Sequence, residues 1–114
     1  MGGTKSKPKC NPDVTTKELD QKIQRGDNVD QCITYLFNKY DLNCDGKLDG
    51  DEALNMRENI TQYVQERENL SFEAALYFSW LMRTKLESYS GGAVTLEAFT
   101  ENIKDLLDFR RLKN

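Results

Sequence analysis

The stretch DLNCDGKLDGDE, from Asp41 to Glu52, places oxygen-bearing side chains at its first, third, fifth, ninth and twelfth positions. Calcium is a hard cation that takes six to eight oxygen ligands, and a curled loop with this spacing turns such oxygens towards one point. Gly46 stands at the sixth position, where the backbone of such a loop bends sharply and a Cβ would be in the way. The pattern predicts a calcium-binding loop, because a merely acidic surface turn does not usually meet all of these constraints.

Each ligand position of the loop has an expected role. The side chains at positions one, three and five bind directly, and the residue at position seven contributes its backbone carbonyl. Position nine binds through a water molecule, and a glutamate at position twelve closes the shell with both carboxylate oxygens. The predicted ligands are Asp41, Asn43, Asp45, Lys47 (through its carbonyl oxygen), Asp49 and Glu52.

Together with its flanking helical patterns, this loop resembles those of the EF-hand family of calcium-binding proteins. The resemblance rests on the six ligand positions and on Gly46 and Leu48. It implies a helix–loop–helix unit, one bound Ca²⁺ ion with Mg²⁺ as a competitor, and a non-enzymatic function. It also implies that Leu48 forms a short β-bridge with a partner loop.

Apolar residues on both sides of the loop recur at the spacing of amphipathic helices, and strand-like alternation is nearly absent. Both prolines lie before residue 13, so the rest of the chain can be helical. Thr15 and Glu18 have the spacing of a capping box, which predicts a short helix near the N-terminus. The expected helices cover about 16–24, 29–40, 51–64, 72–86 and 96–112.

The predicted fold class is all-α: a paired EF-hand domain with an extra short N-terminal helix. A length of 114 residues and a hydrophobic content of 38% support one small domain. Because one helix–loop–helix unit cannot bury its apolar faces alone, we expect a calcium-binding hand at about 29–66 and a second hand at about 72–112. They form a single domain over 15–114, and a disordered basic tail covers 1–14.

The expected second loop, ESYSGGAVTLEA, lies between Leu86 and Phe99. If Val94 pairs with Leu48, three of the four principal ligand positions lack a suitable side chain. Shifting the register by one residue places Glu97 at position twelve but an apolar residue at position one, and a shortened loop is the third alternative. We predict a degenerate hand that pairs with the first and binds no ion; irregular binding through backbone carbonyls is the alternative.

The first ten residues, MGGTKSKPKC, contain the elements of a lipidation signal. Gly2 follows the first Met, and Ser6 stands where an N-myristoylation signal requires a hydroxyl residue. Because one myristoyl chain anchors a protein only marginally, a second element is needed, and Cys10 is a candidate for palmitoylation. The alternative interpretation is a disordered, solubilising tail.

The charge of this segment differs from that of the rest of the chain. It carries +3, whereas the whole chain carries −3, so residues 11–114 carry −6 by difference. Basic residues next to an acyl chain favour an anionic membrane surface, at about 1 kcal/mol each. The three lysines are Lys5, Lys7 and Lys9.

Several classes of function are excluded or disfavoured by composition. The chain contains no histidine, which removes the usual general base and the commonest transition-metal ligand, so we do not expect an enzyme. We expect no nucleic-acid partner. The odd number of cysteines and the lack of a signal peptide favour a reducing, cytoplasmic location, at the inner face of a membrane if the tail is acylated.

The segment AALYFSWLM, residues 74–82, is apolar around nearly its whole circumference. This pattern is typical of the most buried helix of a bundle, and the alternative is a groove for a protein partner, lined by Tyr77, Trp80 and Leu81. We therefore predict a membrane-tethered calcium sensor that exposes an apolar surface to a partner when the ion binds. The alternatives are a calcium buffer that changes little in conformation, and a membrane-anchored scaffold or regulatory subunit with structural EF-hands.

Overall fold

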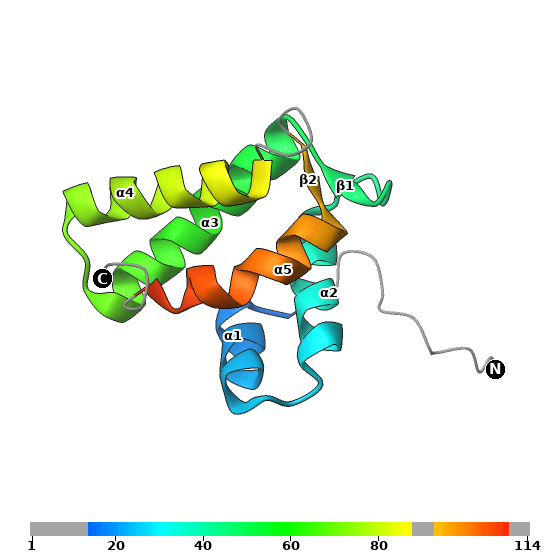
Figure 1. The fold of residues 1–114 in the computed structure, drawn as a ribbon, viewed down its shortest axis with the longest axis horizontal. Coiled ribbons are helices and arrows are strands. Elements are labelled where there is room, and N and C mark those ends of the chain that lie inside the picture. Colours follow the sequence, from blue (N-terminus) through cyan, green and yellow to red (C-terminus); the bar gives the residue numbers. More distant parts are fainter. Residues whose placement is uncertain (1–13, 88–92, 110–114) are drawn as a thin grey trace.

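The computed structural model describes residues 14–87 and 93–109, and this part of the chain is predominantly helical, as predicted (Figure 1). Its only sheet is a short two-stranded one. In chain order the elements are α1 (Thr16–Arg25), α2 (Val29–Tyr40), β1 (Lys47–Leu48), α3 (Asp51–Glu68), α4 (Phe72–Met82), the π-helical turn η1 (Arg83–Glu87), β2 (Val94–Thr95) and α5 (Leu96–Leu107).

Some predicted features lie outside the described residues. These are the basic tail up to residue 13, the centre of the second loop at 88–92 and the end of the last predicted helix beyond 109. The candidate lipidation sites and the lysines beside them belong to that tail. They are Gly2, Cys10, Lys5, Lys7 and Lys9.

Capping side chains fix where three of the helices begin. Thr15 and Glu18 form the predicted capping box at the start of α1. Ser71 accepts a hydrogen bond from the backbone of Ala74 at the start of α4, and Thr95 does the same at the start of α5. Each bond satisfies a backbone N–H that has no partner within its helix.

The predicted third helix, at about 72–86, differs in detail from the structure. The α-helix ends at Met82, and the chain continues through the wider π-helical turn η1. Leu86, within that turn, is fully buried, so the wider turn keeps an apolar side chain directed into the core. Periodicity in the sequence does not distinguish these two kinds of helical turn.

The helices form two helix–loop–helix units that meet at the short sheet. The first unit is α2–β1–α3, and the second is α4–η1–β2–α5. β1 and β2 are antiparallel, and Leu48 lies opposite Val94, as the first of the three proposed registers predicts. Both side chains are fully buried, which places the bridge at the top of the core.

The core lies between the two units. α3 packs mainly against α4, and α2 packs against α5 and α1 (Figure 1). Aromatic rings meet edge to face across the core, with 5.6 Å between the centroids of Phe37 and Phe99 and 5.4 Å between those of Phe78 and Phe109. Within the described residues, no helix is both long enough and apolar enough to cross a bilayer.

Candidate functional site

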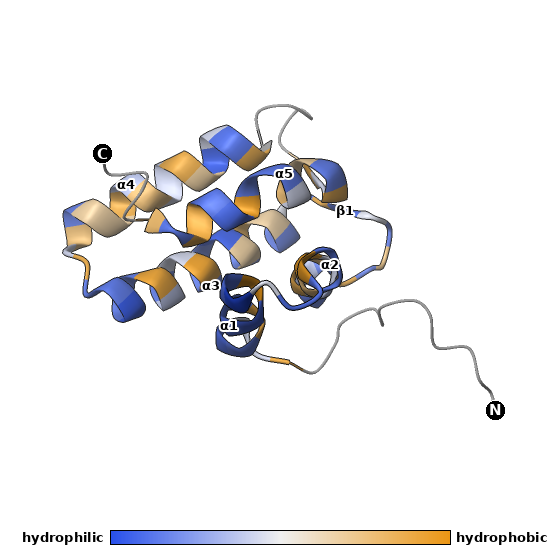
Figure 2. Ribbon diagram, turned by 60° about the horizontal axis from the view of Figure 1, so that its bottom comes forward, coloured by the Kyte–Doolittle hydropathy of each residue, from blue (hydrophilic) through white to orange (hydrophobic). Residues whose placement is uncertain are grey.

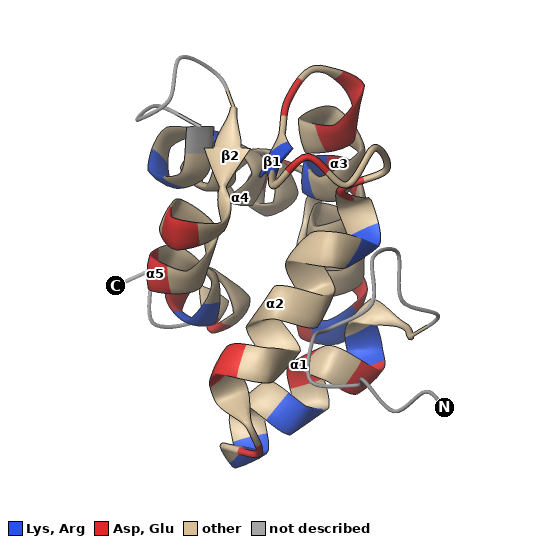
Figure 3. Ribbon diagram, turned by 90° about the vertical axis from the view of Figure 1, so that its right-hand side faces the viewer, with Lys and Arg blue, Asp and Glu red and all other residues tan. Residues whose placement is uncertain are grey.

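Three carboxylates converge in the loop between α2 and α3. One oxygen from each of Asp41, Asp45 and Glu52 lies within 4.8 Å of the others. Two oxygens that bind one calcium ion at 2.3–2.6 Å lie at most about 5 Å apart, so one ion fits all three. Figure 3 shows acidic residues both in the loop before β1 and at the start of α3.

The loop is curled by its own carboxylates. Asp41 accepts hydrogen bonds from the backbone N–H groups of Asp45, at 3.2 Å, and Gly46, at 2.9 Å. Asp45 in turn accepts one from Lys47 at 3.1 Å. These bonds hold the first half of the loop around a common centre, and β1 follows directly.

Gly46 has the conformation that the sequence pattern requires, but not because space is short. Its φ is +87°, in the left-handed region that side chains with a Cβ disfavour. A Cβ added there would meet no heavy atom within 4 Å. The glycine is therefore needed for the backbone conformation, whereas the sequence argument also invoked crowding by a Cβ.

Glu52 contains the most informative atom of the site. The residue is 7% exposed, and its Oε2 accepts a hydrogen bond from the backbone of Asn43 at 3.1 Å. Its Oε1 is buried and has no hydrogen-bond partner. Leaving a buried polar atom without a partner costs about 1–3 kcal/mol, and more when the atom is charged. A group from outside the protein that bound this oxygen would remove that cost.

The remaining predicted ligands lie on the exposed side of the loop. Asn43, Lys47 and Asp49 are all exposed. The carboxylate of Asp49 does not belong to the three-carboxylate cluster, so its binding through a water stays a prediction. The same holds for the side chain of Asn43 and the carbonyl of Lys47.

The described residues of the second unit contain no comparable group. In the part of the chain that the structure describes, the one acidic cluster of this kind lies in the first loop. When Val94 is matched to Leu48, Ala98 stands where the first unit has Glu52, and Ala98 is a buried apolar residue. Glu97, from the shifted register, is exposed.

The cysteines differ from the sequence-based expectation. Cys44, at the fourth loop position, is disulfide-bonded, whereas Cys32 is buried and free. The partner of Cys44 therefore lies outside the described residues. A disulfide does not fit the reducing setting that the odd number of cysteines favours.

The structure separates the three residues of the predicted partner groove. Tyr77 and Trp80 are 45% and 57% exposed, whereas Leu81 is buried and belongs to the core. α4 is therefore not buried on all sides. It directs one face into the core and carries large apolar side chains on the other. Hydrophobic residues run along most of the ribbon of α4 (Figure 2).

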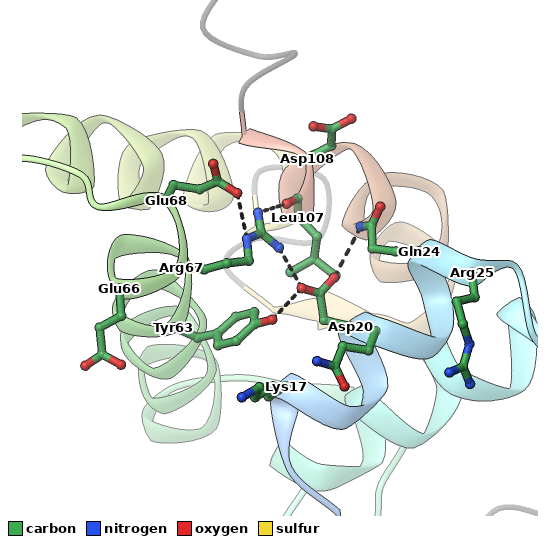
Figure 4. A pocket seen from close by; sticks show the side chains of 11 residues that line it. Lys17, Asp20, Gln24, Arg25, Tyr63, Glu66, Arg67, Glu68, Leu107 and Asp108 are labelled. Atoms are coloured by element: carbon green, nitrogen blue, oxygen red, sulfur yellow. Dashed lines mark hydrogen bonds and ion pairs between the residues drawn. The ribbon is translucent and has the colours of Figure 1, made fainter.

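A second candidate site is a cavity of about 1030 Å³ between α1, α3 and the end of α5 (Figure 4). Asp20 of α1 is 2% exposed and accepts hydrogen bonds from Tyr63 and Arg67 of α3, both at 2.6 Å. Gln24 donates a further hydrogen bond at 3.2 Å. Sequence reasoning missed this group, because a single aspartate on a short polar helix gives no signal of burial.

Arg67 joins three elements at this point. It donates to Asp20, to the carboxylate of Glu68 at 2.8 Å and to the backbone carbonyl of Leu107 at the end of α5. Burial alone would lower the pKa of Arg67, but the neighbouring carboxylates of Asp20 and Glu68 raise it. The charges of this cluster satisfy one another, which indicates a structural junction rather than a ligand site.

No protein-family model matches the chain, and no curated protein or solved structure is significantly similar to it. The assignment of function therefore depends on the geometry of the loop. The buried carboxylate of Asp20 has its hydrogen-bond donors within the protein, whereas that of Glu52 retains an oxygen without a partner.

We predict that Arg67→Gln lowers the free energy of unfolding by about 3 kcal/mol, because it leaves the buried carboxylate of Asp20 without its cation. Arg25→Gln is the matched control, since the side chains of its ion pair with Asp27 are 64% and 54% exposed. The control should change stability by no more than about 0.5 kcal/mol. Urea denaturation at neutral pH measures both, and equal losses would contradict the assigned role of Arg67.

Stability should also fall with rising pH because of Tyr63. Burial, and then its hydrogen bond to Asp20, raise the pKa of Tyr63 from 10.0 to about 12. Between these values the phenol is ionised in the unfolded chain but protonated in the folded one, so stability is present below pH 10 and is lost as the pH rises towards 12. Tyr63→Phe should flatten this dependence in urea denaturation. Burial also raises the pKa of Tyr40, so a weaker slope of the same sign should remain.

Proposed function

We propose that this protein is a calcium-binding regulatory protein of the EF-hand type, in which the loop from Asp41 to Glu52 binds one Ca²⁺ ion. The observation that carries the proposal is Glu52, which belongs to the three-carboxylate cluster and whose buried Oε1 has no hydrogen-bond partner. A divalent cation between the three groups would bind this oxygen and neutralise their charge. The second unit then serves to pair with the first through Leu48 and Val94.

The donor set favours a hard cation. All predicted ligands are oxygens, and oxygen donors suit Ca²⁺, Mg²⁺ and Mn²⁺ rather than the softer transition metals. Mg²⁺ demands near-ideal octahedral geometry and usually retains several waters, whereas Ca²⁺ accepts a larger and more flexible shell. A loop with six ligand positions, one of which binds through a water, and with a glutamate able to bind through two oxygens therefore favours Ca²⁺ and leaves Mg²⁺ as a competitor.

The membrane part of the proposal rests on the sequence alone. Acylation at Gly2, with the lysines of the same tail as further contacts, would hold the domain at an anionic bilayer. Palmitoylation of Cys10 would in addition require that its thiol is not the disulfide partner of Cys44. Myristoylation of the full-length chain in a eukaryotic expression system, detected by mass spectrometry, addresses this part separately from ion binding.

One observation favours the calcium buffer over a sensor that opens widely. α1 and the residues just before it bond to both helices of the first unit. On the side of α2, Thr16 and Tyr40 are hydrogen-bonded at 3.0 Å, and Lys39 donates to the carbonyl of Val14 at 2.9 Å. On the side of α3, Asp20 binds Tyr63 and Arg67. A change of angle between α2 and α3 has to break one of these sets, so α1 opposes opening.

Isothermal titration with Ca²⁺ in a Mg²⁺ background should give one site per chain. We predict that Glu52→Gln weakens binding at least about 100-fold, since loss of a charged ligand costs about 3 kcal/mol. Glu97→Gln is the matched control, because this glutamate is an exposed acid at position twelve of the shifted register in the second unit, and it should leave the affinity unchanged.

Stability without the ion separates a lost ligand from a damaged fold. In the presence of a chelator, Glu52→Gln should be no less stable than the unmodified protein, because the substitution removes charge from a buried oxygen that has no partner. Wild-type affinity in the Glu52→Gln variant would show that the ligand assignment is wrong.

We further predict that Asp20→Asn enlarges the conformational response to Ca²⁺. In the unmodified protein, α1 should limit the change, and binding of an apolar dye should rise little on adding the ion. With the ionic bond to Arg67 removed, dye binding should rise at least about two-fold, as expected when apolar surface between helices opens. Asp27→Asn, at an exposed ion pair, is the control. A large response in the unmodified protein, unchanged by Asp20→Asn, would favour the unrestrained sensor.

A further inference from the structure

The outer face of α4 is apolar and exposed. Four of its large side chains are 45–72% exposed, and four other apolar side chains of the same helix are buried. α4 lies at the outside of the helix assembly, and hydrophobic residues run along most of its length (Figures 1 and 2). The exposed apolar side chains are Phe72, Leu76, Tyr77 and Trp80, and the buried ones are Ala75, Phe78, Leu81 and Met82.

The central line of this face has the spacing of a helix–helix seam. Glu73, Leu76, Trp80 and Arg83 follow one another at intervals of three, four and three residues, and all four are exposed. This is the a/d spacing with which one helix packs along another. The outermost members of the line are charged and of opposite sign, and the two between them are apolar.

The line is complementary to itself when two copies of the helix run antiparallel. Glu73 and Arg83 are placed symmetrically about residue 78, and so are Leu76 and Trp80. In an antiparallel pair, Glu73 of each copy therefore faces Arg83 of the other, and Leu76 faces Trp80. A two-fold interface has this property, because the same patch serves both partners. Antiparallel helices also place their dipoles in the favourable relative direction.

A groove beside the line offers room for a partner side chain. A hollow of about 410 Å³ lies between α3 and α4, and Phe72, Ala75 and Leu76 form its apolar wall. Its charged lining residues are Glu58 and Glu66 of α3. In the antiparallel arrangement Trp80 of the second copy meets Leu76 at the edge of this groove, and Arg83 approaches its acidic side.

We propose that the outer face of α4 is a docking surface for a second copy of this chain, formed by two antiparallel α4 helices. The four apolar side chains expose on the order of 400 Å² per copy, given that a large aromatic side chain presents about 150–250 Å². This is about half of the ~800 Å² per partner of a standard interface. The dimer is therefore reversible, with a dissociation constant of roughly 10–100 µM. The proposal does not depend on calcium binding.

Sedimentation velocity of the full chain over a range of roughly 5–500 µM tests the proposal, with the 10–100 µM midpoint expected from the interface size. Trp80 gives a second readout, because it is the only tryptophan, and its emission should shift to the blue as the concentration rises. Glu73→Lys and Arg83→Glu should each weaken the dimer at least ten-fold, because each places like charges opposite one another twice. Glu101→Lys, an exposed charge reversal on α5, should leave the dimer unchanged.

Mixing the two charge variants tests whether positions 73 and 83 face each other in the dimer. An equimolar mixture of Glu73→Lys and Arg83→Glu should form a heterodimer as tight as the unmodified dimer, since one Glu73–Arg83 pair is retained and the other is replaced by a pair of opposite charges with their positions exchanged. Circular dichroism checks that each variant is folded. The proposal is overturned if the chain stays monomeric throughout, if the mixture shows no rescue, or if Trp80 shifts on anionic vesicles but not with protein concentration.

Discussion

Two buried side chains, Leu48 and Val94, connect the halves of this domain at the end where the acidic loop lies. Neither helix pair can bury its apolar face alone, and the antiparallel bridge sets the register in which the two faces meet. Because β1 follows the first half of the loop and α3 begins just after it, the bridge also fixes the place of Glu52 relative to Asp41. The geometry of the candidate site therefore depends on a contact made by apolar residues.

The domain contains buried carboxylates in two contrasting environments. Asp20 is surrounded by donors from three side chains, so its charge is satisfied within the protein. Glu52 is similarly buried but faces two further carboxylates and retains an oxygen without a partner. The same principle of polar satisfaction thus indicates a structural role for the first group and supports the proposed ligand-binding role of the second.

Much of the fold could be predicted from the sequence because its signals are local. The helices around the loop follow from apolar spacing, and the start of α1 from Thr15 and Glu18. The opposition of Leu48 and Val94 is one of three registers that loop alignment leaves open, and the structure selects it. Burial of Asp20 and exposure of Trp80 could not be predicted, because each depends on which neighbouring helix covers the position. Leu81 and Trp80 are adjacent in sequence, yet one lies in the core and the other in solvent. The three-carboxylate cluster could be predicted, but the missing partner of Glu52 is visible only in three dimensions.

The hydrogen bond from Arg67 to the carbonyl of Leu107 has a consequence for the rigidity of the whole domain. It joins α3 to α5 at the end of the molecule that is opposite the β-bridge (Figure 1). The two units are thus joined at both ends, by the pairing of β1 with β2 at one end and by the guanidinium of Arg67 at the other. Relative rotation of the units about the bridge would pull Arg67 away from Leu107. The domain can in this way keep its units in register through a charge at the end opposite the bridge.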